Sequence, residues 1–114
     1  MTFFKNQSTI RVDENTQRTI LAVGDGLMNV LVKFDKRLDE KSPIPTHHHV
    51  HEQTTFVLRG SFLFTVEFNG KVETQRVKSG DAISFPSCAE HGCIPLEDES
   101  ELIDSFTPIR EDFL

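Results

Sequence analysis

The sequence predicts an all-β protein, folded either as a closed barrel or as a two-sheet jelly roll. Short apolar or alternating stretches recur between turns that contain Gly, Pro or Asn, and no segment keeps a helical period beyond a turn or two. Closing or stacking the strands protects the edges that an open sheet would expose. The chain has 114 residues, a usual length for one domain with one core, so we expect a single domain over residues 1–114.

The first half of the chain predicts one hairpin followed by a long loop. Residues 19–23 and 27–34 are apolar stretches on either side of Gly24-Asp25-Gly26, and glycine accepts the positive φ angles of a tight turn. Residues 35–45 are polar and contain prolines, and should form a loop. We interpret the His-rich residues 47–53 as the start of a strand that continues to residue 58.

The second half predicts a series of antiparallel strands. In residues 61–68 the even positions are Phe or Val and should face a core rich in Phe, because the chain has ten Phe and no Trp or Tyr. Asn69-Gly70 is a strong hairpin turn that pairs this strand with residues 71–77. The predicted order is completed by a turn at 79–81, a strand at 82–85, a strand that begins at His91 and a last strand at 101–106.

The charge balance argues against nucleic acid as a partner. Twelve basic and eighteen acidic side chains give a formal net charge of -6, whereas binding to phosphate backbones relies on Lys and Arg. No stretch approaches the roughly 20 apolar residues of a membrane helix and the first residues lack a signal-peptide core, so we expect a cytoplasmic protein with no membrane partner. In that compartment Cys88 and Cys93 should be reduced, buried thiols.

All five histidines fall in two short segments, which predicts one metal centre assembled from distant parts of the chain. The first segment holds His47, His48, His49 and His51, and the second holds His91. In an extended segment the odd-numbered histidines and Gln53 share one face, while His48 and Glu52 share the other. Imidazole is the commonest metal ligand among side chains. We therefore expect the odd positions to supply ligands and the even positions to lie on the surface.

Two stretches around these histidines resemble the two motifs of the cupin family. Residues 41–60 contain His47, His49, Gln53 and Gly60 at the spacing of the first motif, and residues 80–95 contain Gly80, Pro86 and His91 at the spacing of the second. The resemblance implies a small cupin jelly-roll barrel, a double-stranded β-helix, whose metal ligands are His47, His49, Gln53 and His91. The chain departs from the motifs at Lys41, Gln53, Cys88 and Pro95, and of these only Gln53, which replaces a glutamate, would touch the metal.

Glutamine in place of glutamate changes the charge of the implied site. Three neutral imidazoles and one amide leave a divalent ion its full charge, which favours Lewis-acid chemistry on an anionic or carbonyl substrate over redox chemistry. The ligand set suits one divalent ion of Zn, Ni, Mn, Co or Fe and does not choose among them. The role of His51 stays open between contact with a ligand and exposure to solvent, because it faces inward but the motif does not use it.

The last strand predicts a carboxylate that faces the metal. Leu102, Asp104 and Phe106 alternate, so a face that buries Leu and Phe carries Asp104 inward, where an unpaired carboxylate is costly unless it is used. Asp104 is therefore a candidate acid or base. Together with the His-rich motif, the tail at 101–114 is similar to that of small cupins of the KdgF type, which act in pectin degradation.

This second resemblance implies an activity. Proteins of the KdgF type promote ring opening of 4,5-unsaturated monouronates, which lyases release from pectin or alginate, to the linear keto form. The small-molecule partner would then be a sugar acid bound at the metal, with Asp104 moving the proton, Arg110 engaging the carboxylate and Phe106 packing beside the ring. An alternative for Arg110 is a surface ion pair with Asp112. Analogy with other small barrels implies a homodimer.

Three other functions remain compatible with the sequence. A metal-dependent cyclase or isomerase would act on an apolar carbonyl compound, an iron dioxygenase would consume oxygen, and a non-catalytic sugar-binding or sensor module would bind without turnover. A requirement for an acidic substrate that depends on Arg110 would separate the uronate reaction from the first of these.

Overall fold

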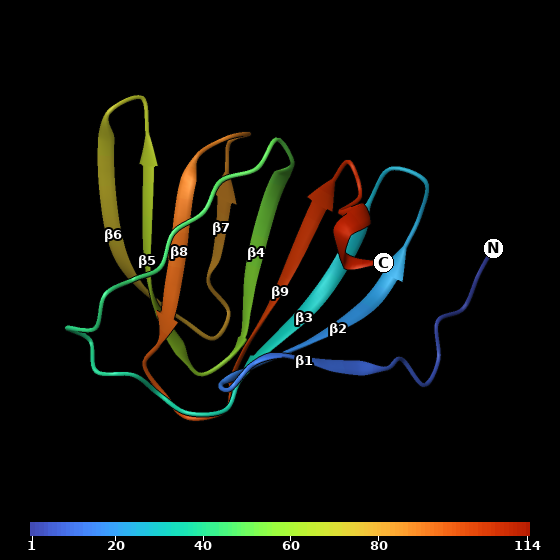
Figure 1. Ribbon diagram of the computed structural model, residues 1–114, viewed down its shortest axis with the longest axis horizontal. Coiled ribbons are helices and arrows are strands. Elements are labelled where there is room, and N and C mark those ends of the chain that lie inside the picture. The colour runs from blue at the N-terminus through green and yellow to red at the C-terminus, as the bar shows by residue number, and fades with distance from the viewer.

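The computed structural model describes residues 1–114 and is built almost entirely of β-strands (Figure 1). The strands are β1 (Thr9–Asp13), β2 (Thr16–Val23), β3 (Met28–Phe34), β4 (Glu52–Arg59), β5 (Ser61–Phe68), β6 (Lys71–Lys78), β7 (Ala82–Phe85), β8 (Glu90–Pro95) and β9 (Ser100–Thr107). A 3-10 turn, η1 (Glu111–Phe113), ends the chain. None of the structure's helical segments has the length and apolar character needed to cross a membrane. The predicted all-β class is confirmed.

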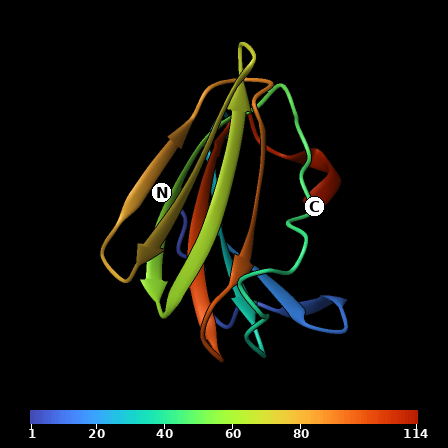
Figure 2. The ribbon, with the colours of Figure 1, turned by 90° about the vertical axis from the view of Figure 1, so that its left-hand side faces the viewer.

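The strands form two antiparallel sheets that face each other. One sheet has six strands in the order β1-β2-β3-β9-β4-β7, and the other has three in the order β6-β5-β8. Figure 2 shows them as two layers, with β5 and β6 nearest the viewer. The hairpins predicted at Gly24-Asp25-Gly26 and at Asn69-Gly70 join β2 to β3 and β5 to β6. Strands distant in sequence, such as β4 and β9, become neighbours in the sheet.

The core between the sheets is made largely of phenylalanine, as the composition predicts. Phe62, Phe64 and Phe85 pack with two aliphatic side chains, Val57 and Leu102, and all five are almost completely buried. A second cluster of Met28, Val30 and Phe106 lies toward the η1 end. Burial of apolar area on this scale is the main stabilising term for such a domain. Val57 and Leu102 of the first cluster fix the inward faces of β4 and β9, which also carry the polar residues described below.

Three expectations from the sequence were wrong. The histidines precede β4 instead of belonging to it, because residues 48–51 form no ladder and only His47 pairs, through an isolated bridge to His91. Phe68 is 41% exposed, since it lies at the end of β5 beside the Asn69 turn and beyond the core. Cys88 is exposed in the loop before β8, with a positive φ of 67°, whereas Cys93 is half-buried.

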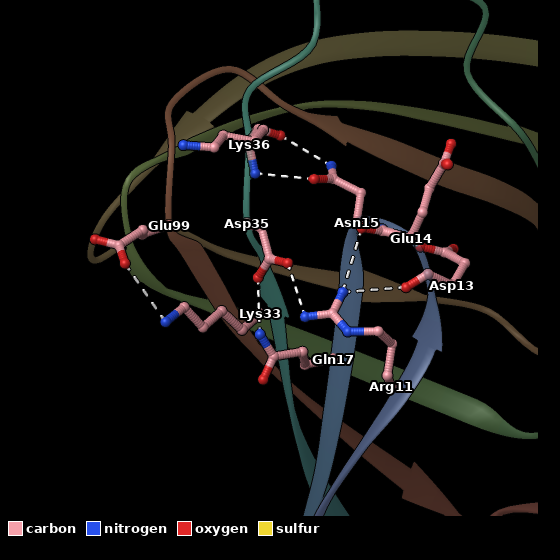
Figure 3. Close-up of polar contacts among 9 residues, drawn as sticks. All are labelled: Arg11, Asp13, Glu14, Asn15, Gln17, Lys33, Asp35, Lys36 and Glu99. Carbon is pink, nitrogen blue, oxygen red and sulfur yellow. Dashed lines mark hydrogen bonds and ion pairs between the residues drawn. The ribbon is translucent and has the colours of Figure 1, made fainter.

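Strand β1 was not anticipated, and a polar network ties it to the rest of the sheet (Figure 3). The guanidinium of Arg11 donates to the carboxylate of Asp35 at 2.9 Å and to the carbonyl oxygen of Asp13. Asn15 exchanges two hydrogen bonds with the backbone of Lys36. These bonds hold the β1–β2 hairpin against the end of β3, so that β2 side chains on the other face are directed between the sheets.

Candidate metal centre

His47, His49 and His91 converge in the structure, as predicted. One ring nitrogen from each lies within 4.8 Å of the others. The ring centroids are 4.6 Å apart for His47 and His91, 5.1 Å for His49 and His91, and 5.6 Å for His47 and His49. His91 is buried on β8, and the other two come from the loop between β3 and β4, which passes in front of β8 in Figure 1.

Backbone contacts bring this loop to β8. His47 and His91 exchange two backbone hydrogen bonds of 3.0 and 2.9 Å, and the amide of Cys88 donates to the carbonyl of His49 at 2.8 Å. Gly92 makes the approach possible, because a Cβ at this position would lie 1.9 Å from the carbonyl oxygen of Pro45. A glycine beside His91 therefore lets the loop lie flat on the strand and places the histidines together.

The hydrogen bonds of two rings show which nitrogen carries the proton. Nδ1 of His91 lies 2.8 Å from the carbonyl oxygen of Ala89, and Nδ1 of His49 lies 3.0 Å from that of His51. A carbonyl oxygen only accepts, so both Nδ1 atoms must donate and both Nε2 atoms keep a lone pair. Nε2 of His91 is buried with no hydrogen-bond partner. This arrangement is typical of metal-binding histidines, which are oriented by a bond from the other ring nitrogen.

Gln53 presents its oxygen to the histidine cluster. Its amide nitrogen donates to Oγ1 of Thr55 at 2.9 Å and to Oδ1 of Asp104 at 3.0 Å, which fixes the orientation of the side-chain amide. Its Oε1 then lies 3.1 Å from Nε2 of His49. Both atoms carry lone pairs when the His49 proton is on Nδ1, and a cation relieves the repulsion between them. The donor set thus fits a bound metal ion.

The three imidazoles are held in the neutral form that binds metals. Desolvation, followed by repulsion from His91 and His49, lowers the pKa of His47 to about 4. His47 is exposed as a whole residue, but its ring faces the rings of His49 and His91. Burial is also the largest cause that lowers the pKa of His49 and the pKa of His91. Neutral imidazoles have a free lone pair at ordinary pH, and metal binding needs to displace no proton.

Asp104 faces inward from β9, as its alternation with Leu102 and Phe106 predicts. Its Oδ1 accepts hydrogen bonds from the Thr55 hydroxyl at 2.6 Å and from the Gln53 amide at 3.0 Å. Burial raises the pKa of Asp104 to about 6, even though both hydrogen bonds and Arg110 act to lower it. A carboxyl group with this pKa can accept and release a proton close to neutral pH.

Of these groups, His47, His91, Gln53 and Asp104 open onto one cavity of about 430 Å³ between the two sheets. Its lining includes His47, Gln53, His91, Asp104, Phe106 and Arg110. A larger depression of about 640 Å³ lies over β6 and β7, but its lining has no histidine and no cysteine. We therefore place the functional site in the smaller cavity, where the metal-binding and titratable side chains meet.

Arg110 both lines the cavity and forms the predicted alternative ion pair. Its Nε and Nη2 donate to the two carboxylate oxygens of Asp112 at 3.1 and 2.8 Å. Its guanidinium carbon lies 5.4 Å from the ring centroid of Phe106 and 4.2 Å from that of Phe113. The ion pair with Asp112 and a contact with a substrate carboxylate are thus compatible roles for Arg110, because Asp112 does not contact Nη1.

The remaining histidines lie outside the cluster. His48 is on the surface and contacts Glu90 at 2.5 Å, and Glu52 is exposed, as the parity of the segment predicts. His51 is half-buried, with Nε2 at 3.2 Å from the carbonyl oxygen of Ile109. It therefore contacts the C-terminal tail and does not join the three-histidine group.

Sequence reasoning missed Thr55, which forms hydrogen bonds with Gln53 and Asp104, and two residues of the cavity lining, Arg18 and Phe113. Thr55 shares the inward face of β4 with Gln53, so the same parity argument would have found it. Arg18 lies on β2 before the apolar stretch that was used to predict that strand, and Phe113 lies in the final turn. Neither residue belongs to a sequence pattern that indicates a role in the site, because each reaches the cavity only through contacts between distant parts of the chain.

Two facing antiparallel sheets that enclose a histidine cluster define a small jelly-roll barrel with a candidate metal site. The chain belongs to the cupin family: the cupin domain model matches residues 37–103. Within that family it is a small cupin of the KdgF type. The resemblance seen in the two motifs and the C-terminal tail is therefore confirmed.

Three relatives illustrate the similarity. The pectin degradation protein KdgF of Dickeya dadantii (strain 3937) is 36% identical over 101 residues, which is 89% of this chain and 86% of that protein. The structure of KdgF from Halomonas sp. has a TM-score of 0.86 and 36% identity, covering 100% of this chain and 99% of that one. An RmlC-like cupin from Shewanella frigidimarina NCIMB 400 has a TM-score of 0.80 and 28% identity, covering 99% and 94% of the two chains.

Proposed function

We propose that this protein is a metal-dependent, non-redox enzyme that promotes ring opening and ketonisation of 4,5-unsaturated monouronates derived from pectin or alginate. The observation that carries the proposal is the direct link between the histidine cluster and an inward carboxyl group: Gln53 contacts His49 through Oε1 and Asp104 through its amide nitrogen. The similarity to the pectin degradation protein KdgF supports the choice of substrate class.

His47, His49, His91 and Gln53 would hold one divalent ion of Zn, Ni, Mn, Co or Fe. The four ligand atoms are three imidazole nitrogens and one amide oxygen, and none carries a charge. When bound, the ion supplies Lewis-acid polarisation of a substrate oxygen. The protein's own contribution is to hold these atoms in place through the carbonyls of Ala89 and His51 and through the side chain of Thr55.

Asp104 would move the protons of the reaction. Ring opening breaks the bond between C1 and the ring oxygen, so that the C1 hydroxyl loses a proton and the ring oxygen gains one. Ketonisation then moves the proton of the resulting enol from that oxygen to C4. The sum is an isomerisation that needs no oxidant or reductant, and one carboxyl group with a pKa of about 6 can serve both steps.

Phe106 and Arg110 would position the sugar acid. The Phe106 ring is buried beside His49, at a centroid distance of 5.7 Å, and offers an apolar face next to the cluster. Arg110 keeps Nη1 for an acidic group while Asp112 holds its other two nitrogen atoms. The two arginines in the lining, Arg18 and Arg110, favour an anionic substrate over the apolar carbonyl compound of the cyclase alternative.

We also propose that the protein works in the cytoplasm as a homodimer. The free edge of the six-stranded sheet supports the dimer, because β1 ends the strand order and leaves Ile10 49% and Val12 48% exposed. Apolar side chains on an unpaired edge favour association with another strand. Light scattering on the purified protein measures the mass: a value of one chain would contradict the dimer.

The test is turnover of 4,5-unsaturated galacturonate. Loss of the conjugated enol absorbance should be faster with metal-loaded protein than in buffer alone, and the Asp104→Ala variant should return it to the buffer rate. The product, followed by NMR, should be the linear keto acid. No acceleration over buffer would refute the proposed reaction and favour the cyclase, dioxygenase or binding alternatives.

A further inference from the structure

Two arginines line the cavity, and their charges are used differently. Arg110 gives two of its nitrogen atoms to the carboxylate of Asp112. The side chain of Arg18 donates no hydrogen bond and forms no ion pair with any carboxylate of the protein, and its Nε is buried without an acceptor. A half-buried guanidinium without a partner is costly, because its lost hydration is not replaced. Arg18 is therefore the positively charged side chain of this cavity that has no anionic partner within the protein.

The position of Arg18 follows from the sheet. Arg18 lies on β2 between Ile10 of β1 and Val32 of β3, and Thr16 and Val32 line the cavity with it. Arg11, on the adjacent strand, instead directs its guanidinium into the surface network of Figure 3 and is satisfied there by Asp35. The two arginines thus have opposite roles, one at the surface of the hairpin and one between the sheets.

Phe113 holds the Arg18 side chain in place. The guanidinium carbon of Arg18 lies 3.9 Å from the ring centroid of Phe113, close enough for a cation–π contact. Phe113 in turn packs edge-on against Phe106, with centroids 5.8 Å apart. Stacking occupies the face of a guanidinium and leaves its N–H edge free, which is the edge that binds a carboxylate with two parallel hydrogen bonds.

We propose that Arg18 is an anion-binding residue of the cavity and that, beside the free Nη1 of Arg110, it binds the carboxylate of a small sugar acid whose other end faces the histidine cluster. The site is built by the β2 backbone and the Phe113 ring, and it offers a positive charge inside a protein whose net charge is -6. The inference deepens the proposed function and rests on it only for the identity of the anion. Arg110 also lies over the Phe113 ring, with its guanidinium carbon 4.2 Å from the centroid, and it is held by Asp112.

Equilibrium binding of galacturonate tests the proposal. Galacturonate lacks the C4–C5 double bond and is not a substrate of the proposed reaction, so its binding can be measured by calorimetry on the metal-loaded protein. Galactose, which lacks the carboxylate, is the neutral probe. The Arg18→Gln variant should bind galacturonate at least about tenfold more weakly, the loss expected for one charge-assisted hydrogen bond. Arg59→Gln is the matched control, because Arg59 is 65% exposed and outside the cavity.

The outcomes separate a binding role from a structural one. We expect Arg18→Lys, which keeps the charge, to retain part of the affinity, and galactose to bind equally to all variants. In the unaltered protein, the NMR signal of the Arg18 Nε–H should shift with galacturonate and stay in place with galactose, a readout that does not depend on any variant folding. Equal galacturonate affinity in Arg18→Gln, or no carboxylate-dependent shift, would overturn the proposal whatever the turnover assay shows.

Discussion

Replacing Asp104 by Asn isolates the cost of its buried charge. Both hydrogen bonds to Asp104, from Thr55 and from Gln53, fall on Oδ1, so the carbonyl oxygen of an asparagine at this position can accept both. The substitution therefore removes the charge and leaves the network in place. Asp104→Ala, by contrast, removes the acceptor and leaves a buried hydroxyl and a buried amide unsatisfied.

The magnitude follows from the pKa of Asp104, which burial raises from 3.8 to about 6. Below pH 3.8 the group is protonated in both the folded and the unfolded chain, and its charge costs nothing. As the pH rises through this interval the unfolded chain loses the proton first, so stability falls with pH and the full cost is present above pH 6. The difference between 3.8 and about 6, at about 1.4 kcal/mol per pH unit, corresponds to about 3 kcal/mol at pH 8.

The assay is urea unfolding of metal-free protein at pH 4 and pH 8. The chain has no Trp and no Tyr, so far-ultraviolet circular dichroism is the suitable signal. Asp104→Asn should have a free energy of unfolding above that of the unaltered protein at pH 8, by about 1–3 kcal/mol, and close to it at pH 4. Because the two proteins are compared at the same pH, contributions that do not involve residue 104 cancel in the difference. The same difference at both pH values, or a less stable variant at pH 8, would refute this reasoning.

Two further predictions concern the metal centre. In Gly92→Ala the new Cβ would lie 1.9 Å from the Pro45 backbone, so the loop must move and metal affinity should fall at least about tenfold. Gly26→Ala is the control and should bind metal as before, because the space around its Cβ is open. Competition with a chelator measures both affinities, and an unchanged affinity in Gly92→Ala would contradict the packing argument. Acidification should have little effect on metal affinity between pH 7.5 and pH 6, because the pKa of all three imidazoles is depressed. A site with three histidines of ordinary pKa would lose metal affinity by about 50-fold over that range. A loss of that size would show that the three rings are not desolvated as described.

Local patterns were enough to predict the turns and the inward-facing side chains. Asn69-Gly70 defines a hairpin by itself, and alternation placed Asp104 on the buried face of its strand. Parity also selected His47 and His49, and the structure brings both rings to His91 although residues 48–51 form a loop. In the turn and in the strand, the direction of a side chain follows from neighbouring residues alone, whereas the position of the histidine loop also depends on its backbone bonds to His91 and Cys88.

What could not be predicted depends on contacts between distant residues. Arg18 and Phe113 lie near opposite ends of the chain, and only the barrel brings the guanidinium onto the ring. The loop reaches β8 because Gly92 is free of a side chain, a fact that no periodicity reveals. The exposure of Phe68 likewise depends on where the core ends, and not on the alternation of β5.

The central claim is that the histidine cluster and Asp104 act together on an unsaturated uronate. The most direct measurement is the rate of absorbance loss of 4,5-unsaturated galacturonate with EDTA-stripped protein, before and after each of the five candidate divalent metals is added back, for the unaltered protein and for His91→Ala. We predict the buffer rate for stripped protein, recovery with at least one metal, and no recovery for His91→Ala. Full activity in the stripped protein, or equal recovery in His91→Ala, would contradict the account.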